Sequence, residues 1–212
     1  MIELSSGLLT VERLKGLSDS VLLVALTILA YNLVPPTLIN NQLDQYELES
    51  FFDNLFGMVA SFVVIFLFWI FYMKILDYLK EPNDIVILAS LVFFVLILIL
   101  PVFTLAQAQY ENVLAVTTLS LLVIAIDLIL IFIWKYIQKR SVIIQFDKKE
   151  IKSIHTIFFI ILSLYTISIM VSVYDIKASV LFPVIMIPIL LLLNNLVKLN
   201  RTVFLNRIYW PG

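Results

Sequence analysis

Six long apolar stretches limit this chain to very few folds. They cover residues 15–35, 51–73, 85–106, 113–134, 154–173 and 178–197. Each contains the about 20 predominantly apolar residues that a helix needs to cross the hydrocarbon core of a bilayer. Because an α-helix satisfies its own backbone hydrogen bonds, it is the form that such stretches take in lipid. We therefore expect an all-α integral membrane protein whose six transmembrane helices form a single domain over residues 1–212.

The composition agrees with a membrane protein and argues against several other classes. Hydrophobic residues make up 62% of the chain and charged residues 14%, whereas a soluble domain has about 45–50% and about 25%. The chain has no cysteine and one histidine, so neither a disulfide framework nor a clustered metal site is expected. No H-E-x-x-H, G-x-S-x-G or glycine-rich phosphate loop occurs. We expect no enzymatic activity, no cofactor and no nucleic-acid partner.

Lysine and arginine residues predict the orientation in the membrane. Of the 14 in the chain, only Lys177 falls in a connection on the outer side of the predicted bundle. The others lie before or at the start of the first stretch, after the second and fourth stretches, and after the sixth. Because short cytoplasmic loops carry the excess of basic residues, both termini are expected to be cytoplasmic. The protein is then a multi-pass protein of the plasma membrane.

The connections between the stretches suggest where an ion would pass. No T-V-G-Y-G sequence and no apolar dip of a re-entrant pore loop lies between them, so a filter would have to consist of helix side chains. The predicted outer loop Leu38–Asp53 contains four acidic residues and no basic one. Such a loop would concentrate cations near a pore mouth. Acidic outer loops also occur wherever basic residues are kept inside.

The first apolar helix is unusual because it carries a polar cluster at one end. Asp19 lies about one turn inside the apolar stretch, where an unpaired carboxylate costs several kcal/mol. Arg13 lies six residues earlier, which is not the spacing that places two side chains on one helix face. We therefore expect Arg13, Ser18 and Asp19 to contact other helices or subunits. The alternative is that Asp19 only reaches the headgroup level.

Higher in the same helix, Val24, Ile28 and Tyr31 recur at spacings of four and three, which places them on one face. Thr27 lies beside them. Apolar side chains of this kind around an axis can exclude water, and hydroxyl groups can replace part of the hydration shell of an ion. These residues are thus candidates for a pore lining. The alternative is that the stripe serves ordinary helix packing.

Two further features concern the third and fourth stretches. Pro101 predicts a kink or the end of the third helix. Asp127 is a second carboxylate inside a predicted span, and such residues are functional candidates by default. It would act as a proton or ion relay, or pair with a polar group such as Arg13 or Ser168. A proton- or cation-coupled secondary transporter that uses Asp127 is therefore the alternative to a channel.

The start of the first helix resembles the signature of the transmembrane protein 175 family, the endosomal/lysosomal potassium channels and their prokaryotic relatives. The motif reads RLKGLSD over residues 13–19, followed by an apolar helix with Thr27 and a closing proline. Ser61-Phe62 and Trp69 in the second stretch, and Pro101 in the third, also fit. The chain has Leu17 where the family usually has phenylalanine. It also lacks the histidine that commonly follows the tryptophan.

The resemblance implies a homotetrameric, potassium-permeable cation channel in the lipid bilayer, with a central pore lined by the first helix of each subunit. It implies that Val24 and Ile28, with Tyr31 above them, form a hydrophobic constriction. Thr27 would form an adjacent polar layer that favours potassium over other monovalent cations. Arg13, Ser18 and Asp19 would anchor the first helix, and Trp69 would pack in the second. Tyr31 is bulky for this position, so Asn32 is a candidate to replace it in the lining.

Overall fold

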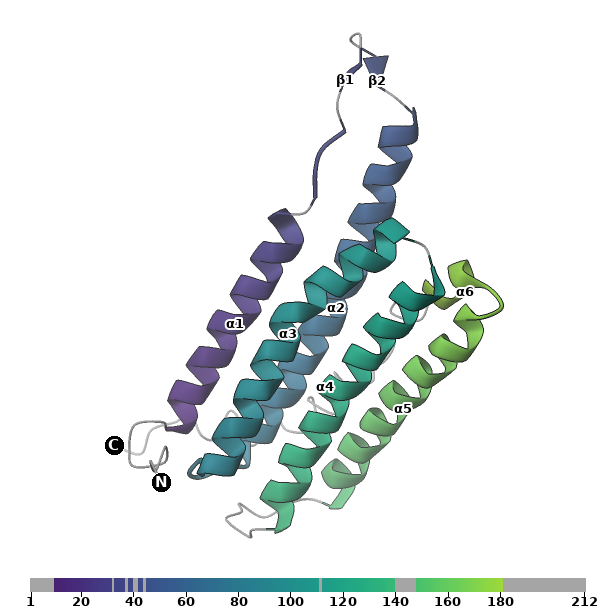
Figure 1. Cartoon of the computed structure of the whole chain (residues 1–212). Helices are drawn as coiled ribbons and strands as arrows, with labels where there is room; N and C mark the ends of the chain where they lie inside the picture. The colour runs from purple at the N-terminus through teal and green to yellow at the C-terminus, as the bar shows by residue number, and fades with distance from the viewer. Residues whose placement is uncertain are drawn as a thin grey trace.

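The computed structural model of the chain is a bundle of helices (Figure 1). It describes residues 10–31, 33–36, 38–39, 42–43, 45–110, 112–139 and 148–180. The helices are α1 (Val11–Tyr31), α2 (Gln45–Asp77), α3 (Asp84–Tyr110), α4 (Val113–Lys139), α5 (Lys148–Ser172) and the short α6 (Ile176–Val180). A two-residue antiparallel hairpin, β1 (Leu38–Ile39) and β2 (Gln42–Leu43), joins α1 to α2 with Leu38 opposite Leu43.

Five of the six predicted spanning helices are confirmed. Within the described part of the chain, α1 to α5 are each long and apolar enough to cross a membrane. The predicted sixth span, residues 178–197, lies mostly beyond Val180 and so outside the described residues. The first residues of that span belong to α6. The fold class is thus a helical membrane bundle with at least these five spans.

The boundaries of the first two helices differ from the sequence prediction. The helix α1 begins at Val11, four residues earlier than expected, and Thr10 Oγ1 accepts a hydrogen bond from the backbone N–H of Arg13 at 3.3 Å. It ends at Tyr31, before the two prolines. The prediction that Leu38–Asp53 is a loop was wrong, because this segment contains the β1–β2 hairpin and the first turns of α2. Acidic residues in the first turns of a helix interact favourably with its dipole.

The helix α2 is longer than a bilayer is thick. It has 33 residues, which at about 1.5 Å per residue span about 50 Å, against a hydrocarbon core of about 30 Å. Figure 1 shows its N-terminal part standing above the ends of α1 and α3. Near this end, Gln45 Nε2 donates a hydrogen bond to Glu49 Oε1 at 3.2 Å, one turn farther along.

The proline in the third span does not end its helix. Pro101 lies inside α3, which continues to Tyr110, so of the predicted kink or helix end the helix end does not occur at this residue. Three residues later, Thr104 Oγ1 donates a hydrogen bond to the carbonyl oxygen of Leu100 at 3.0 Å. This bond goes to the carbonyl one turn before Thr104, whereas the carbonyl that lacks an N–H partner because of Pro101 is that of Ile97.

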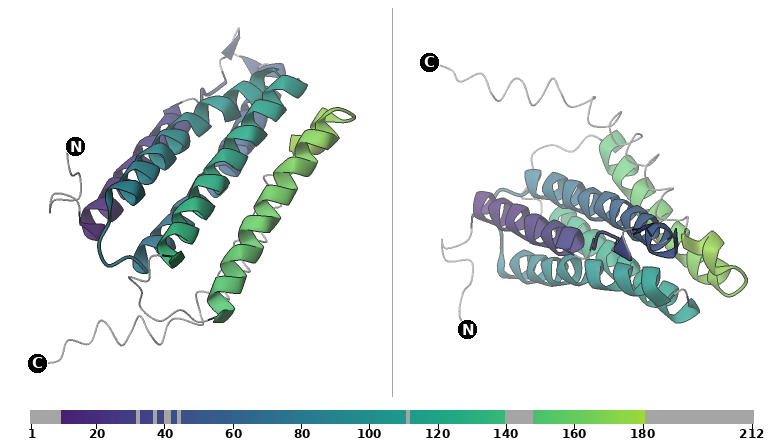
Figure 2. Two further views of the ribbon diagram at one scale, coloured as in Figure 1. Left: turned by 60° about the horizontal axis from the view of Figure 1, so that its bottom comes forward. Right: turned by 90° about the horizontal axis from the view of Figure 1, so that it is seen from above.

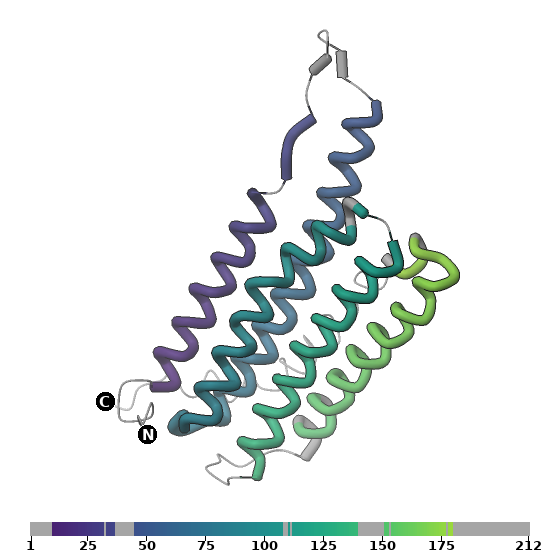
Figure 3. The backbone as a smooth tube through the Cα atoms, viewed as in Figure 1, coloured from purple at the N-terminus to yellow at the C-terminus, as the bar shows by residue number. Residues whose placement is uncertain are grey.

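The helices run alternately up and down (Figures 1 and 3), with α1 at one edge of the bundle and α5 at the other. The helix α1 packs mainly on α2 and α3, while α4 packs on α2, α3, α5 and α6. The view from above in Figure 2 shows the same arrangement. The helix at the edge, α1, therefore has one side in the bundle and one side open.

Aromatic side chains fill the centre of the bundle. Tyr72 of α2 stacks on Phe93 of α3 with 4.8 Å between ring centroids, and Phe71 lies 5.6 Å from Phe158 of α5. Tyr78 meets Trp134 of α4 edge to face at 5.5 Å. Large rings of this kind contribute packing energy beyond the apolar area that they bury. They join α2 to the three helices that follow it.

Asparagine residues begin both α3 and α4. Asn83 Oδ1 accepts a hydrogen bond from the backbone N–H of Val86 at 3.1 Å, and Asn112 Oδ1 accepts one from Ala115 at 2.8 Å. Both are helix N-caps. Asn83 has a second role, because its Nδ2 donates to the hydroxyl oxygen of Tyr136 in α4 at 2.6 Å. It therefore ties the start of α3 to the end of α4.

The two asparagines provide a test of this tie. Asn83→Ala should lower the free energy of unfolding by about 2 kcal/mol, because it removes both a cap and a hydrogen bond between helices. The matched control Asn112→Ala, which loses only a cap, should cost about 1 kcal/mol. Denaturant unfolding of the purified protein in detergent measures both. Equal losses would contradict the contribution of the Tyr136 contact.

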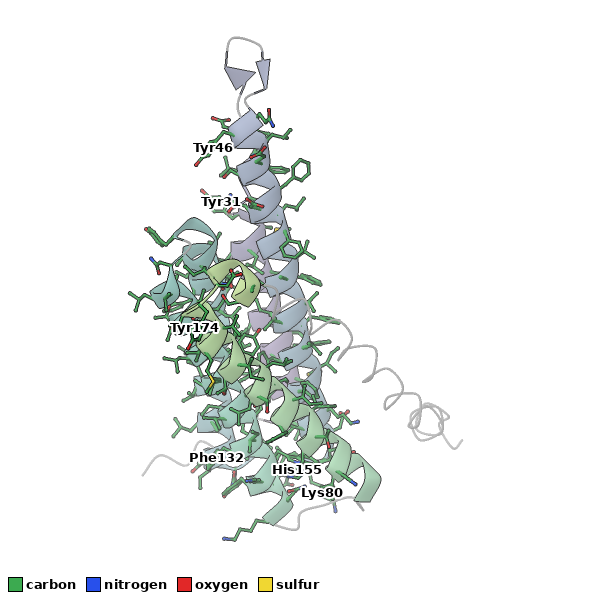
Figure 4. All side chains as sticks on the ribbon, turned by 90° about the vertical axis from the view of Figure 1, so that its right-hand side faces the viewer. Tyr31, Tyr46, Lys80, Phe132, His155 and Tyr174 are labelled. Carbon is green, nitrogen blue, oxygen red and sulfur yellow. The ribbon has the colours of Figure 1, made fainter. Side chains whose placement is uncertain are left out.

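The two ends of the bundle differ in charge. Figure 4 labels Lys80 and His155 near one end, and Tyr31, Tyr46 and Tyr174 toward the other. The basic residues of the described chain whose side chains are placed belong to the end of the bundle where Lys80 lies: Arg13, Lys15, Lys74, Lys80, Lys135, Lys139 and Lys152. Carboxylates Glu47, Glu49 and Asp53 lie on the projecting part of α2 at the other end.

Candidate functional site

The helix α1 is attached to the bundle along one face only. Its buried residues recur at spacings typical of one side of a helix: Val11, Leu14, Ser18, Ala25 and Leu29. This side meets α2 and α3. Among the five spans, α1 buries the smallest share of its apolar window, 22%, against 33–50% for the others. Most of the surface of α1 is thus available to something outside the single bundle.

The opposite side of α1, here termed the open face, is partly polar. It consists of exposed residues that recur every three or four positions: Arg13, Gly16, Leu17, Ser20, Leu23, Val24, Thr27, Ala30 and Tyr31. Val24 is 49% and Tyr31 86% exposed. The small or polar residues Gly16, Ser20 and Thr27 share this face with apolar ones. The exposed sides of α3 and α4, in contrast, carry mainly large apolar residues, which suit lipid.

The hydroxyl groups on the open face are oriented by their own helix. Thr27 Oγ1 donates a hydrogen bond to the carbonyl oxygen of Leu23 at 2.8 Å, and Ser20 Oγ donates one to Gly16 at 3.0 Å. With the proton directed back to the backbone, the lone pairs of each oxygen remain as acceptors. An oxygen presented in this way can replace a water molecule around a cation.

The residues predicted to form the constriction are not equally exposed on α1. Val24 and Tyr31 lie on the open face, as does Thr27, whereas Ile28 is only half-exposed and lies at the border with the packed side. Asn32, the alternative to Tyr31, lies outside the described residues. The open face is therefore centred nearer to Thr27 than the spacing of Val24, Ile28 and Tyr31 suggested.

Asp19 contacts the second helix. The indole Nε1–H of Trp69 donates a hydrogen bond to Asp19 Oδ1 at 3.0 Å, and the Trp69 ring stacks on Phe66 with 5.4 Å between centroids. Ser18, the neighbour of Asp19, is 2% exposed and lines a small pocket with Trp69 between α1, α2 and α3. Arg13 lies on the open face. The motif thus connects α1 to α2 mainly through Asp19.

A second polar contact between α1 and α2 was not predicted from the sequence. Lys15 Nζ and Asp77 Oδ1 form an ion pair at 2.6 Å. Lys15 lies one turn before Asp19 on α1, and Asp77 lies two turns after Trp69 on α2, as expected for antiparallel neighbours. The two residues are 62 positions apart in sequence, so only the packing of the helices reveals the pair. Together the two contacts fix the end of α1 where the basic residues gather.

Asp127 is buried in α4 and is 0% exposed. Neither carboxylate oxygen has a hydrogen-bond partner, so the expected pairing with Arg13 or Ser168 was wrong. The Ser168 hydroxyl donates instead to the carbonyl oxygen of Ser179 at 3.4 Å and ties α5 to α6. The sequence shows that Asp127 lies inside a span but not toward which neighbour α4 turns it. The described residues hold no group of three metal-ligating side chains.

The ion pair provides a test of how α1 is attached. Lys15→Asp or Asp77→Lys alone should destabilise the protein by about 0.5–1 kcal/mol, since a partly exposed pair contributes little. The exchange of both residues should recover most of that loss in a double-mutant cycle. The control combines Asp77→Lys with Lys80→Asp, because Lys80 is an exposed lysine at the same end of the bundle. This double mutant should not recover the lost stability. Recovery in the control would show a general charge effect instead of a pair.

Comparisons with known proteins identify a matching family model and a similar solved structure. A family model described as endosomal/lysosomal potassium channel TMEM175 matches residues 13–101, which run from the start of the motif to Pro101 of α3. The chain is also similar to the crystal structure of a lysosomal potassium-selective channel TMEM175 homolog from Chamaesiphon minutus. The TM-score is 0.74 at 19% identity, over 85% of this chain and 96% of that one. At this identity the likeness shows a shared fold. No curated protein matches the chain.

These findings confirm the family resemblance inferred from the sequence. The family model covers both contacts of Asp19 and Lys15 with α2, and the shared fold extends beyond the matched segment. The family and the similar structure are ion channels, not enzymes. Residues 13–101 of this chain are similar to the family of endosomal/lysosomal potassium channels TMEM175.

Proposed function

We propose that this protein is a homotetrameric, potassium-permeable cation channel whose pore and hydrophobic constriction are formed by α1 of each subunit. The observation that carries the proposal is the open face of α1, where Gly16, Ser20 and Thr27 are exposed beside Val24 and Tyr31. Hydroxyl groups of membrane helices usually face other helices or water, because lipid offers them no partner. An aqueous pathway along this face would give them one.

Several copies are needed to enclose such a pathway. A single bundle leaves the open face of α1 at its edge (Figure 1), and rotation about an axis beside α1 would bring equivalent faces together. The number four comes from the family resemblance. The similar structure from Chamaesiphon minutus is described as potassium-selective, which supports potassium as the permeant ion.

In this proposal an ion meets two kinds of surface along α1. Val24, with Tyr31 above it, supplies apolar rings that resist wetting when they are narrow. Thr27, between them, supplies oxygens with free lone pairs. Ile28 lies at the border of the open face, so a rotation of α1 about its own axis would move it into or out of the lining. Opening then corresponds to widening of the apolar rings while the end of α1 near Lys15 stays attached to α2.

The charge distribution supports the orientation and the entry path. Basic residues at one end of the bundle favour the cytoplasmic side of the plasma membrane, which would place both termini there. The opposite end carries Glu47, Glu49 and Asp53 on the projecting part of α2. Four copies of these carboxylates would raise the local concentration of cations at the outer mouth. The proposed channel is of the prokaryotic, single-bundle type.

Asp127 supports one alternative function. A carboxylate that is fully buried and unpartnered inside a span is found in proton relays and coupled transporters. Potassium flux into liposomes that contain the purified protein distinguishes the two functions. Fast flux without a proton gradient supports the channel, and slow saturable flux coupled to such a gradient supports the transporter.

The first test removes the hydroxyl group of Thr27, which forms the proposed polar layer of the pore. Thr27→Ala should reduce the permeability of potassium relative to sodium several-fold, because it removes the polar layer, while Thr27→Ser should retain it. Thr166→Ala is the matched control, because Thr166 on α5 is also exposed and makes the same hydrogen bond, to Leu162, at 2.7 Å. Reversal potentials under bi-ionic conditions measure the ratio. An unchanged ratio in Thr27→Ala would contradict the assignment.

The second test reduces the size of the apolar side chains in the proposed constriction. Val24→Ala should raise single-channel conductance or leak, since a smaller side chain leaves a wider and more easily wetted constriction. Ile28→Ala should do the same if α1 rotates as proposed. Val95→Ala on α3, where Val95 is 54% exposed, is the control and should leave conductance unchanged. Planar bilayer recordings measure all three, and identical currents in Val24→Ala and the parent protein would exclude Val24 from the lining.

A further inference from the structure

Asp127 occupies an apolar interior that is distinct from the open face of α1. It lies near the middle of α4, which packs on α2, α3, α5 and α6, whereas α1 packs mainly on α2 and α3. Its neighbours on the buried side of α4 are apolar, among them Val123, Ile126 and Leu130. Asp127 is 0% exposed, so it does not line the proposed pore.

Neither carboxylate oxygen of Asp127 has a hydrogen-bond partner among the described residues. The charged or titratable groups of the neighbouring helices lie toward the helix ends, except for two tyrosines and Lys74, which follows Tyr72 by two residues on α2. The residues at or near the ends are Glu47, Glu49, Asp53 and Asp77 of α2, Asp84 of α3, Lys152 and His155 of α5, and Asp175 before α6. The tyrosines Tyr72 of α2 and Tyr165 of α5 are buried. A buried carboxylate without a cationic partner is strongly disfavoured in its charged form.

A second buried polar group lies at about the same depth as Asp127. The helices α2 and α4 run in the same direction (Figure 1), and Tyr78 contacts Trp134 near their ends. Tyr72 precedes Tyr78 by six residues and Asp127 precedes Trp134 by seven, so the two are level along the bundle. The Tyr72 hydroxyl lies near Ser90 of α3, whereas neither oxygen of Asp127 has a hydrogen-bond partner. Asp127 is thus the unpartnered group of this layer.

We propose that Asp127 is a proton-binding site inside the bundle, which holds its proton in the folded protein at neutral pH. A proton is the one cation that needs no further ligands, whereas a metal ion in this position would need several oxygens, and the described residues provide no cluster of them. Loss of the proton would place a negative charge among apolar side chains of α4 and its neighbours. Deprotonation would therefore loosen the packing of α4.

Infrared spectroscopy of the full-length protein in lipid vesicles tests the proposal directly. At neutral pH we expect the carbonyl stretching band of a protonated carboxylic acid in an apolar site, shifted in deuterated water. The band should be lost in Asp127→Asn and retained in Glu81→Gln, a variant at an exposed carboxylate. Absence of the band from the parent protein, or its retention in Asp127→Asn, would overturn the proposal.

A pH series of thermal unfolding provides a second measurement. If the folded state binds one more proton than the unfolded state, the stability of the parent protein must fall as pH rises. Asp127→Asn should lack this part of the fall, so the difference in melting temperature between the two proteins should change with pH. A parent protein that instead gains stability relative to Asp127→Asn, or is stabilised by added potassium or sodium through Asp127, would show an ionised site. Neither measurement uses ion flux, so failure here is separate from failure of the proposed channel function.

Discussion

The attachment of α1 along a single face is the constraint on which the rest of the structure depends. A helix in lipid has no net hydrophobic force that holds it to its neighbours, so its position must come from packing and from polar contacts. In α1 the apolar contacts are made by small or medium side chains such as Ala25 and Leu29. The polar contacts, Asp19 with Trp69 and Lys15 with Asp77, lie in its first half. The second half packs on α2 and α3 through Ala25 and Leu29, and it carries Val24, Thr27 and Tyr31.

This division explains how one helix can be both fixed and adjustable. The polar contacts define where α1 starts and which side it turns to α2. Beyond Asp19, a change in tilt or rotation disturbs the van der Waals contacts of Ala25 and Leu29, which are individually weak. In the proposed channel, the residues that contact the ion are therefore carried by the part of α1 that is least restrained, while the family motif lies in the part that is most restrained.

Much of the fold was predictable because the membrane limits the chain to helices of a given length. The five described spans follow from hydropathy, and the similarity to the TMEM175 family from the RLKGLSD motif at residues 13–19. What failed depended on local detail or on packing. The helix α3 continues through Pro101, and acidic residues that suggested a loop instead lie in the first turns of α2. The partner of Lys15, the border position of Ile28 and the isolation of Asp127 all depend on how each helix is rotated, which an almost uniformly apolar sequence does not encode in its periodicity.

The length of α2 has a mechanical consequence. The helix has 33 residues and contains no proline, the residue that most often interrupts such a helix, so it is a continuous rod from the outer projection to Asp77. Both polar contacts with α1 lie on its far part, at Trp69 and Asp77. The outer projection, Trp69 and Asp77 are thus parts of one rigid element, so the position of the projection in the outer water is tied to the position of the end of α1 that is most firmly held.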